Sequence, residues 1–313
     1  MFTYFINSLN AVLPIFFIMF CGYLARRAGI LTRAEVTRVN KLIFYVFLPV
    51  LIAYNIHNSD LKTSFNLPFI SYAVLGIVGE ALVAWIFARR VVKRADQRGV
   101  VIQSLFRTNI TLMGIQLLAN LVPGADLGPL SLLTAFSTLV INTLSVLFLE
   151  ASVGDRPKPG AMLLRVAKNP MIVGCVVGLL ILVLDIRLPT ALENTARDMA
   201  RVASPLSLFL LGAFFQMDTC RNQWKLLASV TTMRLVVLPG LFLGLAALLG
   251  FRDIYFASLI PVFASATAAP SFAMVQQVGG DAELAGNLVV STSLFCSVTI
   301  FFWCFLFQLL HLF

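Results

Sequence analysis

Residues 107–116 read Arg-Thr-Asn-Ile-Thr-Leu-Met-Gly-Ile-Gln, and they interrupt an otherwise apolar run that extends over about 99–120. A second run, over about 254–277, carries a similar interruption at 265–271, Ser-Ala-Thr-Ala-Ala-Pro-Ser. Within a membrane, unwound backbone is tolerated only where it is buried in protein or lines a polar cavity. The two stretches therefore predict a pair of broken helices that share a site. Gly, Pro, Ser and Thr are also common packing residues of unbroken membrane helices, and this alternative stays open.

The composition is that of a membrane protein, because 59% of the 313 residues are hydrophobic, 12% are charged and the mean hydropathy is +0.93. A soluble domain of this length could not bury so much apolar surface. The formal charge of +9 does not indicate a nucleic-acid partner, since the basic residues lie in short segments between apolar runs. The first run is followed by Arg26 and Arg27 and has no basic segment before it, so we interpret it as a retained span.

The residue types of catalytic and metal sites are poorly placed in this sequence. The five cysteines lie in or beside apolar runs without a CxxC pair, and the two histidines, His57 and His311, are far apart. An intramembrane aspartyl protease needs two membrane-embedded aspartates, which the apolar runs do not supply. We therefore expect no enzymatic activity, no metal and no cofactor.

Ten apolar runs are long enough to be membrane-spanning helices, numbered here in chain order. Their approximate limits are 7–25, 41–56, 67–88, 99–120, 130–149, 170–186, 202–217, 226–249, 254–277 and 285–310. Lys and Arg gather in the loops after helices 1, 3, 5 and 7. Basic loops mark the cytoplasmic side, so this pattern predicts an inner-membrane protein with both termini outside.

An internal repeat relates the two halves of the chain. A shift of 156 superposes five pairs of residues without a gap: Pro14 on Pro170, Gly22 on Gly178, Pro49 on Pro205, Thr111 on Thr267 and Gly114 on Pro270. Because five is an odd number of helices, the second copy of such a unit enters the membrane from the side opposite to the first. The predicted fold is therefore an all-α membrane protein of ten helices in two inverted five-helix repeats, 1–156 and 157–313, which suits transport by alternating access.

Three charged residues fall inside the predicted helices: Glu80, Arg107 and Arg234. Arg107 lies about 13 Å inside helix 4, and a buried guanidinium there could bind a carboxylate bidentately. Alternatively, Arg107 reaches the membrane interface or pairs with Glu80. Glu80 either carries a coupling proton or neutralises Arg107. Arg234 could lie at the cytoplasmic interface if helix 8 begins later than assigned.

Polar and small residues of the interrupted helices complete the predicted site. The candidate substrate-binding residues are Arg107, Asn109, Thr111, Gly114, Gln116, Ser265, Thr267, Pro270 and Ser271. Candidates for coupling to H⁺ or Na⁺ are Glu80, Asn142, Ser291 and Thr292. For any one of these hydroxyl or amide groups, hydrogen bonding between helices is an alternative role. The pattern favours a carrier of small carboxylates, and a channel or sensor that uses the same cavity is the alternative.

The sequence resembles bacterial permeases of the auxin efflux carrier family, within the bile/arsenite/riboflavin transporter superfamily. The resemblance spans nearly the whole chain and rests on four motifs: Leu13-Pro14-Ile15-Phe16 with Gly22-Tyr23-Leu24, residues 40–49 (NKLIFYVFLP), Phe106-Arg107-Thr108-Asn109, and Gly279-Gly280-Asp281-Ala282-Glu283-Leu284-Ala285 with Ser291-Thr292.

This resemblance implies a transport domain (65–150 and 225–313) that moves as an elevator against a scaffold (1–60 and 165–220). It also implies crossing helices 4 and 9 at the substrate site, a homodimer through the scaffold, and substrates such as malonate, malate or auxin-like acids. Arg107, Asn109 and Thr267 match the family pattern. The chain departs from it at Gln116 and Ala266, where the family commonly has proline.

Overall fold

The computed structural model describes residues 2–58, 66–122, 128–152, 164–215 and 223–313, and the regular elements in these ranges are all helical. The first half contains α1 (Phe2–Arg27), α2 (Arg33–Leu42), the π-helical η1 (Ile43–Phe47), α3 (Leu48–His57), α4 (Leu67–Val91), α5 (Ala95–Phe106), α6 (Ile110–Leu121) and α7 (Gly128–Ser152). The second half contains α9 (Pro170–Val183), α10 (Thr190–Phe214), α12 (Trp224–Thr232), the π-helical η2 (Met233–Val237), α13 (Leu238–Leu248), α14 (Asp253–Ala264), α15 (Pro270–Val278) and α16 (Ala282–Leu309).

Five of the described helical segments are long and apolar enough to cross a membrane: Arg33–His57, Leu67–Val91, Gly128–Ser152, Trp224–Leu248 and Ala282–Leu309. Two shorter apolar helices, Pro170–Val183 and Asp253–Ala264, accompany them. The prediction of an all-helical membrane protein is confirmed at this level.

Two of the long segments contain a π-helical turn directly before a Leu-Pro pair. Proline has no N–H and its ring clashes with the carbonyl four residues earlier, so a regular helix cannot pass through it unchanged. The preceding leucines donate instead to the carbonyl five residues back, Leu48 to Ile43 and Leu238 to Met233. The carbonyl of Leu235, which Pro239 cannot serve, accepts a hydrogen bond from the Trp303 indole at 2.9 Å. The widened turns thus accommodate both prolines inside continuous helices.

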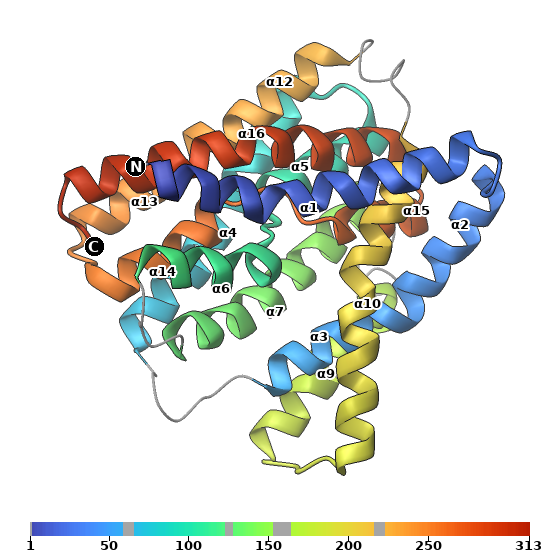
Figure 1. The fold of residues 1–313 in the computed structure, drawn as a ribbon, viewed down its shortest axis with the longest axis horizontal. Helices are drawn as coiled ribbons and strands as arrows, with labels where there is room; N and C mark the ends of the chain where they lie inside the picture. Colours follow the sequence, from blue (N-terminus) through green and yellow to red (C-terminus); the bar gives the residue numbers. More distant parts are fainter. Residues whose placement is uncertain (1, 59–65, 123–127, 153–163, 216–222) are drawn as a thin grey trace.

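Glycines bring one set of helices into close contact. A Cβ atom on Gly22 of α1 would lie 1.9 Å from the carbonyl oxygen of Phe209 in α10, and one on Gly212 would lie 1.8 Å from that of Met19. Gly178 of α9 approaches Ala53 of α3 in the same way, at 2.8 Å. Small residues let membrane helices approach this closely. We call α1, α2–η1–α3, α9 and α10 the glycine-packed group; α3, α9 and α10 lie together in the lower part of Figure 1.

The remaining helices form a second body around the two short helix pairs α5–α6 and α14–α15. We call α4–α7 and α12–α16 the crossing group (Figure 1). Its aromatic side chains pack between helices, as in the stacked pair Phe242 and Phe263, whose ring centroids are 5.5 Å apart. Helix α16 of this group lies beside α1 of the glycine-packed group (Figure 1).

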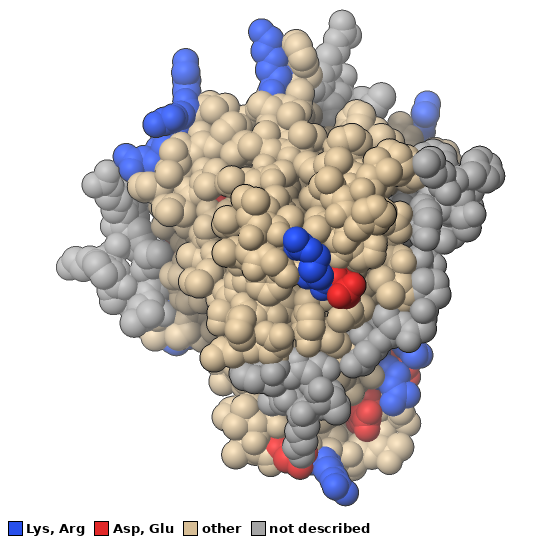
Figure 2. Space-filling view, turned by 90° about the vertical axis from the view of Figure 1, so that its left-hand side faces the viewer, with Lys and Arg blue, Asp and Glu red and all other residues tan. Residues whose placement is uncertain are grey.

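The end of the molecule that carries both termini is poor in charge. Figure 2 shows this face, on which a basic and an acidic side chain are seen near the centre, the other charged side chains in view lie toward the edges, and uncharged residues fill most of the rest. Basic side chains of the opposite end include Arg26, Arg27 and Arg33, at and beyond the end of α1. The two ends of the molecule therefore differ in their content of basic residues.

Candidate functional site

The two interrupted helices meet at their breaks. Helix α5 ends at Phe106 and α6 begins at Ile110, whereas α14 ends at Ala264 and α15 begins at Pro270. Thr108 and Thr267 pair as an isolated antiparallel bridge between the breaks. The Asn109 N–H donates to Ala266 O at 3.0 Å, and the Ala268 N–H donates to Arg107 O at 3.1 Å. Each unwound segment thereby satisfies backbone groups of the other, as burial requires.

The first break is shorter than the sequence suggested. It covers only Arg107 to Asn109, so Thr111, Gly114 and Gln116 lie within helix α6. Gly114 is buried, and a Cβ atom there would approach Ile110 Cγ1 to 3.2 Å. The side chains of Thr111 and Gln116 lie outside the described part of the chain. Only the first part of the polar stretch 107–116 is unwound, because the Asn109 carbonyl already accepts the first helical hydrogen bond, from Met113.

Threonine hydroxyls cap the broken helices reciprocally. Thr108 Oγ1 donates to Pro261 O at 2.9 Å, and Thr267 Oγ1 donates to Ser104 O at 2.8 Å. Each hydroxyl thus serves a carbonyl that the last turn of the opposite broken helix leaves free. Ser265 Oγ bonds to the Thr108 hydroxyl and accepts from the Asn109 N–H at 3.1 Å. Ser265 and Thr267, both predicted to bind substrate, are thus engaged in holding the breaks together.

Arg234 and Glu80 form a buried ion pair behind the breaks. Both side chains are 0% exposed, and Arg234 Nη1 lies 3.3 Å from Glu80 Oε1. The same guanidinium donates to Leu105 O at 2.8 Å and to Ser265 O at 3.1 Å, beside the carboxyl ends of α5 and α14. A cation is favourable at a helix C-terminus. The alternative that Glu80 neutralises Arg107 is wrong, because Glu80 pairs with Arg234. The alternative that Arg234 lies at the interface is also wrong, because its side chain is fully buried beside the ends of the broken helices.

Arg107 faces a pocket on the other side of the breaks. Its side chain is only 4% exposed, and among the described residues it forms no ion pair. Its Nη1 contacts the thioether of Met274 at 3.8 Å, a weak acceptor, and its Nε has no hydrogen-bond partner in the described structure. A buried cation without a counter-ion is costly, so this site is suited to an anion.

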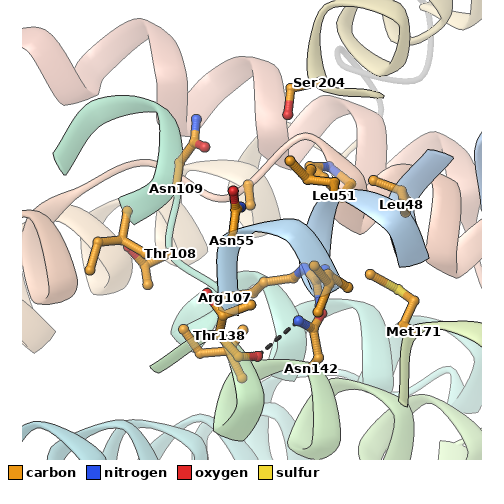
Figure 3. A pocket seen from close by; sticks show the side chains of 15 residues that line it. Leu48, Leu51, Asn55, Arg107, Thr108, Asn109, Thr138, Asn142, Met171 and Ser204 are labelled. Atoms are coloured by element: carbon orange, nitrogen blue, oxygen red, sulfur yellow. Dashed lines mark hydrogen bonds between the residues drawn. The ribbon is translucent and has the colours of Figure 1, made fainter. Parts of the chain in front are cut away.

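The pocket lies between the breaks and the glycine-packed group, as Figure 3 shows. Its cavity measures about 60 Å³, which is room for a carboxylate-sized group. The Asn142 amide nitrogen donates to Thr138 O at 2.8 Å beside Arg107. The lining residues are Leu48, Leu51, Ile52, Asn55, Arg107, Thr108, Asn109, Ile110, Thr138, Ile141, Asn142, Met171, Ser204, Ala268 and Pro270.

The predicted site residues divide into two sets. Arg107, Asn109, Pro270 and Asn142 line the pocket, whereas Ser265, Thr267 and Ser271 do not. The coupling candidates Ser291 and Thr292 also lie away from it. Thr292 Oγ1 accepts from the Thr267 N–H at 3.2 Å, and the Ser291 hydroxyl bonds to that of Thr231 at 3.0 Å.

Sequence reasoning missed the side of the pocket formed by the glycine-packed group. Asn55 on α3 and Ser204 on α10 line it there, together with Thr138 on α7 of the crossing group. The sequence does not show which neighbouring helix a single polar residue in an apolar helix faces. Ser204 adjoins Pro205, a position of the internal repeat, and this adjacency was the one available hint. Within the described ranges, no cluster of three or more His, Cys, Asp or Glu residues could hold a metal ion.

A membrane chain with a polar pocket where two interrupted helices meet is built as transporters are built. The chain belongs to the family described as "Membrane transport protein", whose model matches residues 7–159 and 156–304. The predicted resemblance to auxin efflux carriers is thereby confirmed. This membership makes the chain a multi-pass membrane protein of small-molecule transport and favours that role over an enzymatic one.

Two relatives match along most of their length. A protein of Rhizobium meliloti (strain 1021) named "Putative malonate transporter" is 23% identical over 304 residues, which cover 92% of each chain. A protein of Methanothermobacter thermautotrophicus named "Uncharacterized transporter" is 20% identical over 302 residues, covering 96% of this chain and 98% of its own.

Proposed function

We propose that the chain is a secondary active transporter of small organic anions, mono- or dicarboxylates, that works by alternating access. The observation that carries this proposal is the buried guanidinium of Arg107, which lines the pocket and forms no ion pair among the described residues. A guanidinium is always charged and matches the geometry of a carboxylate. The name of the Rhizobium meliloti relative adds malonate as a candidate substrate.

The contrast with Arg234 supports a binding role for Arg107. Arg234 is equally buried, and its Nη2 likewise has no hydrogen-bond partner in the described structure, but it is neutralised by Glu80 and donates to two helix-end carbonyls. Among the described residues, the Arg107 guanidinium contacts only the thioether of Met274, and it points into the cavity (Figure 3). Arg234 is therefore suited to a structural role, and Arg107 is suited to binding a ligand.

Paired contacts support an inverted repeat of ten helices. Gly22 packs against Phe209, and Gly178 packs against Ala53. A shift of 156 carries Gly22 onto Gly178 and Ala53 onto Phe209, so the two contacts are equivalent in the two halves. The hydroxyl caps are also reciprocal, although not at that exact shift: Thr267 bonds Ser104 O and Thr108 bonds Pro261 O, which relates the threonines by 159 (267 − 108) and the carbonyls by 157 (261 − 104). Two halves related in this way can exchange conformations and so open the site to either side.

The two groups of helices correspond to the proposed moving parts. In this proposal the crossing group is an elevator-type transport domain, and the glycine-packed group is the scaffold through which a homodimer forms. The few charges on the face with the termini suit the outer side of an inner membrane (Figure 2). Coupling to H⁺ or Na⁺ would make the transport active.

Uptake into proteoliposomes tests the proposal. Arg107→Gln should lower the saturable uptake of malonate by about ten- to a hundredfold, the value of a charged hydrogen bond of roughly 1.5–3 kcal/mol. Arg252→Gln is the matched control, since Arg252 is exposed and, within the described ranges, its side chain bonds only the nearby carbonyls of Ala247 and Phe251. Equal uptake by the Arg107 variant and wild type would refute the assigned role. Flux without saturation or counterflow would indicate a channel.

A further inference from the structure

The described pocket lining contains a single charged side chain, that of Arg107. Its walls are otherwise apolar or carry amides and hydroxyls, including Asn109, Thr138 and Asn142. The number of negative charges that the site can hold is therefore set by Arg107 and by the charges directly behind the breaks.

The charges behind the breaks cancel. Arg234 and Glu80 neutralise each other. The four helix ends that meet at the breaks also sum to no net charge. The carboxyl ends of α5 and α14, each equivalent to about half a negative charge, lie toward Arg234, and the amino ends of α6 and α15, each about half a positive charge, border the pocket at Ile110 and Pro270. What remains is the single positive charge of Arg107. A buried ligand with two negative charges would keep one of them uncompensated, which is strongly unfavourable.

Asn142 supplies a feature that Arg107 lacks. Its amide nitrogen donates to Thr138 O at 2.8 Å, which fixes the orientation of the amide. Its Oδ1 is buried and has no hydrogen-bond partner in the described structure. The pocket thus contains an unused donor, Arg107 Nε, and an unused acceptor, Asn142 Oδ1. This combination complements a molecule with one carboxylate and one O–H group.

We infer that the pocket binds a singly charged ligand with one carboxylate on Arg107 and one O–H donor on Asn142 Oδ1. A dicarboxylate such as malonate therefore binds as its mono-protonated form and brings one proton with it. This inference rests on the proposed function and makes Asn142 a residue that determines specificity. The apolar side chains of Leu48, Ile52 and Met171 suit the uncharged remainder of such a molecule.

Few other titratable groups face this pair. Cys175 of α9 interacts electrostatically with Arg107 and its thiol lies within hydrogen-bonding reach of the Asn142 side chain, and Met274 of α15 does not titrate. The lining residues of α3 and α10 are uncharged, and Glu80 with Arg234 lies behind the breaks. A proton taken up with the ligand therefore resides on the ligand itself or on Glu80.

Calorimetry on the purified full chain tests the inference with malonate and its monomethyl ester. Titrations in buffers of different ionisation enthalpy count the protons taken up. We expect one proton for each malonate bound and none for the monomethyl ester. The apparent Kd for malonate should rise about tenfold for each pH unit above the second pKa of malonate, as linkage to one proton requires. Malonate binding without proton uptake, at constant affinity, would overturn the inference while leaving the proposed function intact.

Two further comparisons locate the proton. Fluoromalonate is a stronger acid than malonate, so the onset of the pH dependence should move to lower pH with this ligand. An unchanged onset would place the proton on Glu80 and contradict the inference. Asn142→Leu should weaken malonate binding by about tenfold, the value of a hydrogen bond of roughly 1.5 kcal/mol, and change monomethyl malonate binding little. Ser145→Ala, a buried change on the same helix outside the pocket, is the matched control.

The outcomes separate this inference from the proposed function. If neither malonate nor its monomethyl ester binds to the wild-type chain, the proposed function fails and the inference fails with it. If both bind through Arg107 but Asn142→Leu weakens them equally, the carrier remains and the assigned O–H contact is wrong.

Discussion

Arg234 donates to backbone carbonyls beside both broken helices, and Glu80 supplies the opposite charge. Removal of one member of a buried ion pair leaves the other charge uncompensated, which costs more than an exposed pair is worth. The pair therefore stabilises the breaks only as long as it is complete.

Glu80→Gln should lower the free energy of unfolding by about 3–5 kcal/mol. Unfolding of the purified chain in detergent, followed by circular dichroism, measures this loss. The control is Glu193→Gln, because Glu193 is 37% exposed and pairs with Arg197 on one helix at 3.6 Å; its loss should cost about 0.5 kcal/mol or less. Equal losses in the two variants would show that the buried pair is not stabilising.

The sequence placed Glu80, Arg107 and Arg234 inside predicted helices, and all three side chains are buried. It could not assign their partners. Arg107 and Arg234 lie on opposite sides of the breaks, one toward the pocket and one toward the ends of α5 and α14. Spacing along a helix says nothing about which side of a crossing a residue occupies, so the pairing of Glu80 had to come from the structure.

At the scale of elements, the close approach of α1 and α10 depends on two residues without side chains. A Cβ atom on Gly212 would overlap the Met19 carbonyl, which is backbone and cannot rotate away. The helices would have to separate, and the glycine-packed group would lose contact along their length.

Gly212→Ala should therefore destabilise the chain by about 3 kcal/mol or more, the upper range for overpacked sites. Thermal unfolding in detergent is a suitable measurement. Gly244→Ala provides the control, because a Cβ atom there meets nothing within 4 Å. If both variants unfold at the wild-type temperature, α1 and α10 do not need this close contact.

Hydropathy located the helices but misjudged some of their limits. The run predicted at 41–56 belongs to a helical segment that begins at Arg33, and the one at 202–217 belongs to α10, which begins at Thr190. Both additions are polar and so do not register as apolar runs. Helix α2 begins instead with a capping box, in which the side chains of Thr32 and Glu35 each bond the other's backbone N–H.

At the scale of the whole molecule, polar contacts tie the two groups together at one end. The Asn40 amide donates to Gln276 Oε1 at 2.6 Å, and Arg33 lies 2.6 Å from Glu283. The first member of each pair belongs to α2 and the second to α15 or α16. If the crossing group moves as an elevator, these contacts must break in each cycle.

A cleavable cross-link between cysteines at positions 40 and 276, in a cysteine-free background, should therefore abolish uptake, and its cleavage should restore uptake. Substrate flux into proteoliposomes is the measurement. The matched control is a pair at Tyr54 and Arg197, which touch at 3.2 Å within the glycine-packed group. Full uptake with the first cross-link in place would exclude relative movement of the groups there.

The reciprocal caps of Thr108 and Thr267 also bear on how such a chain could arise. Each interrupted helix obtains a hydroxyl donor for its last turn from the opposite half of the chain. A half on its own would leave a carbonyl unpaired in lipid, so it would be viable only beside a second copy inserted the other way up. If the two halves are the inverted repeats proposed above, an ancestor of half the length would have needed to insert in both orientations, and gene fusion would have fixed one orientation for each copy.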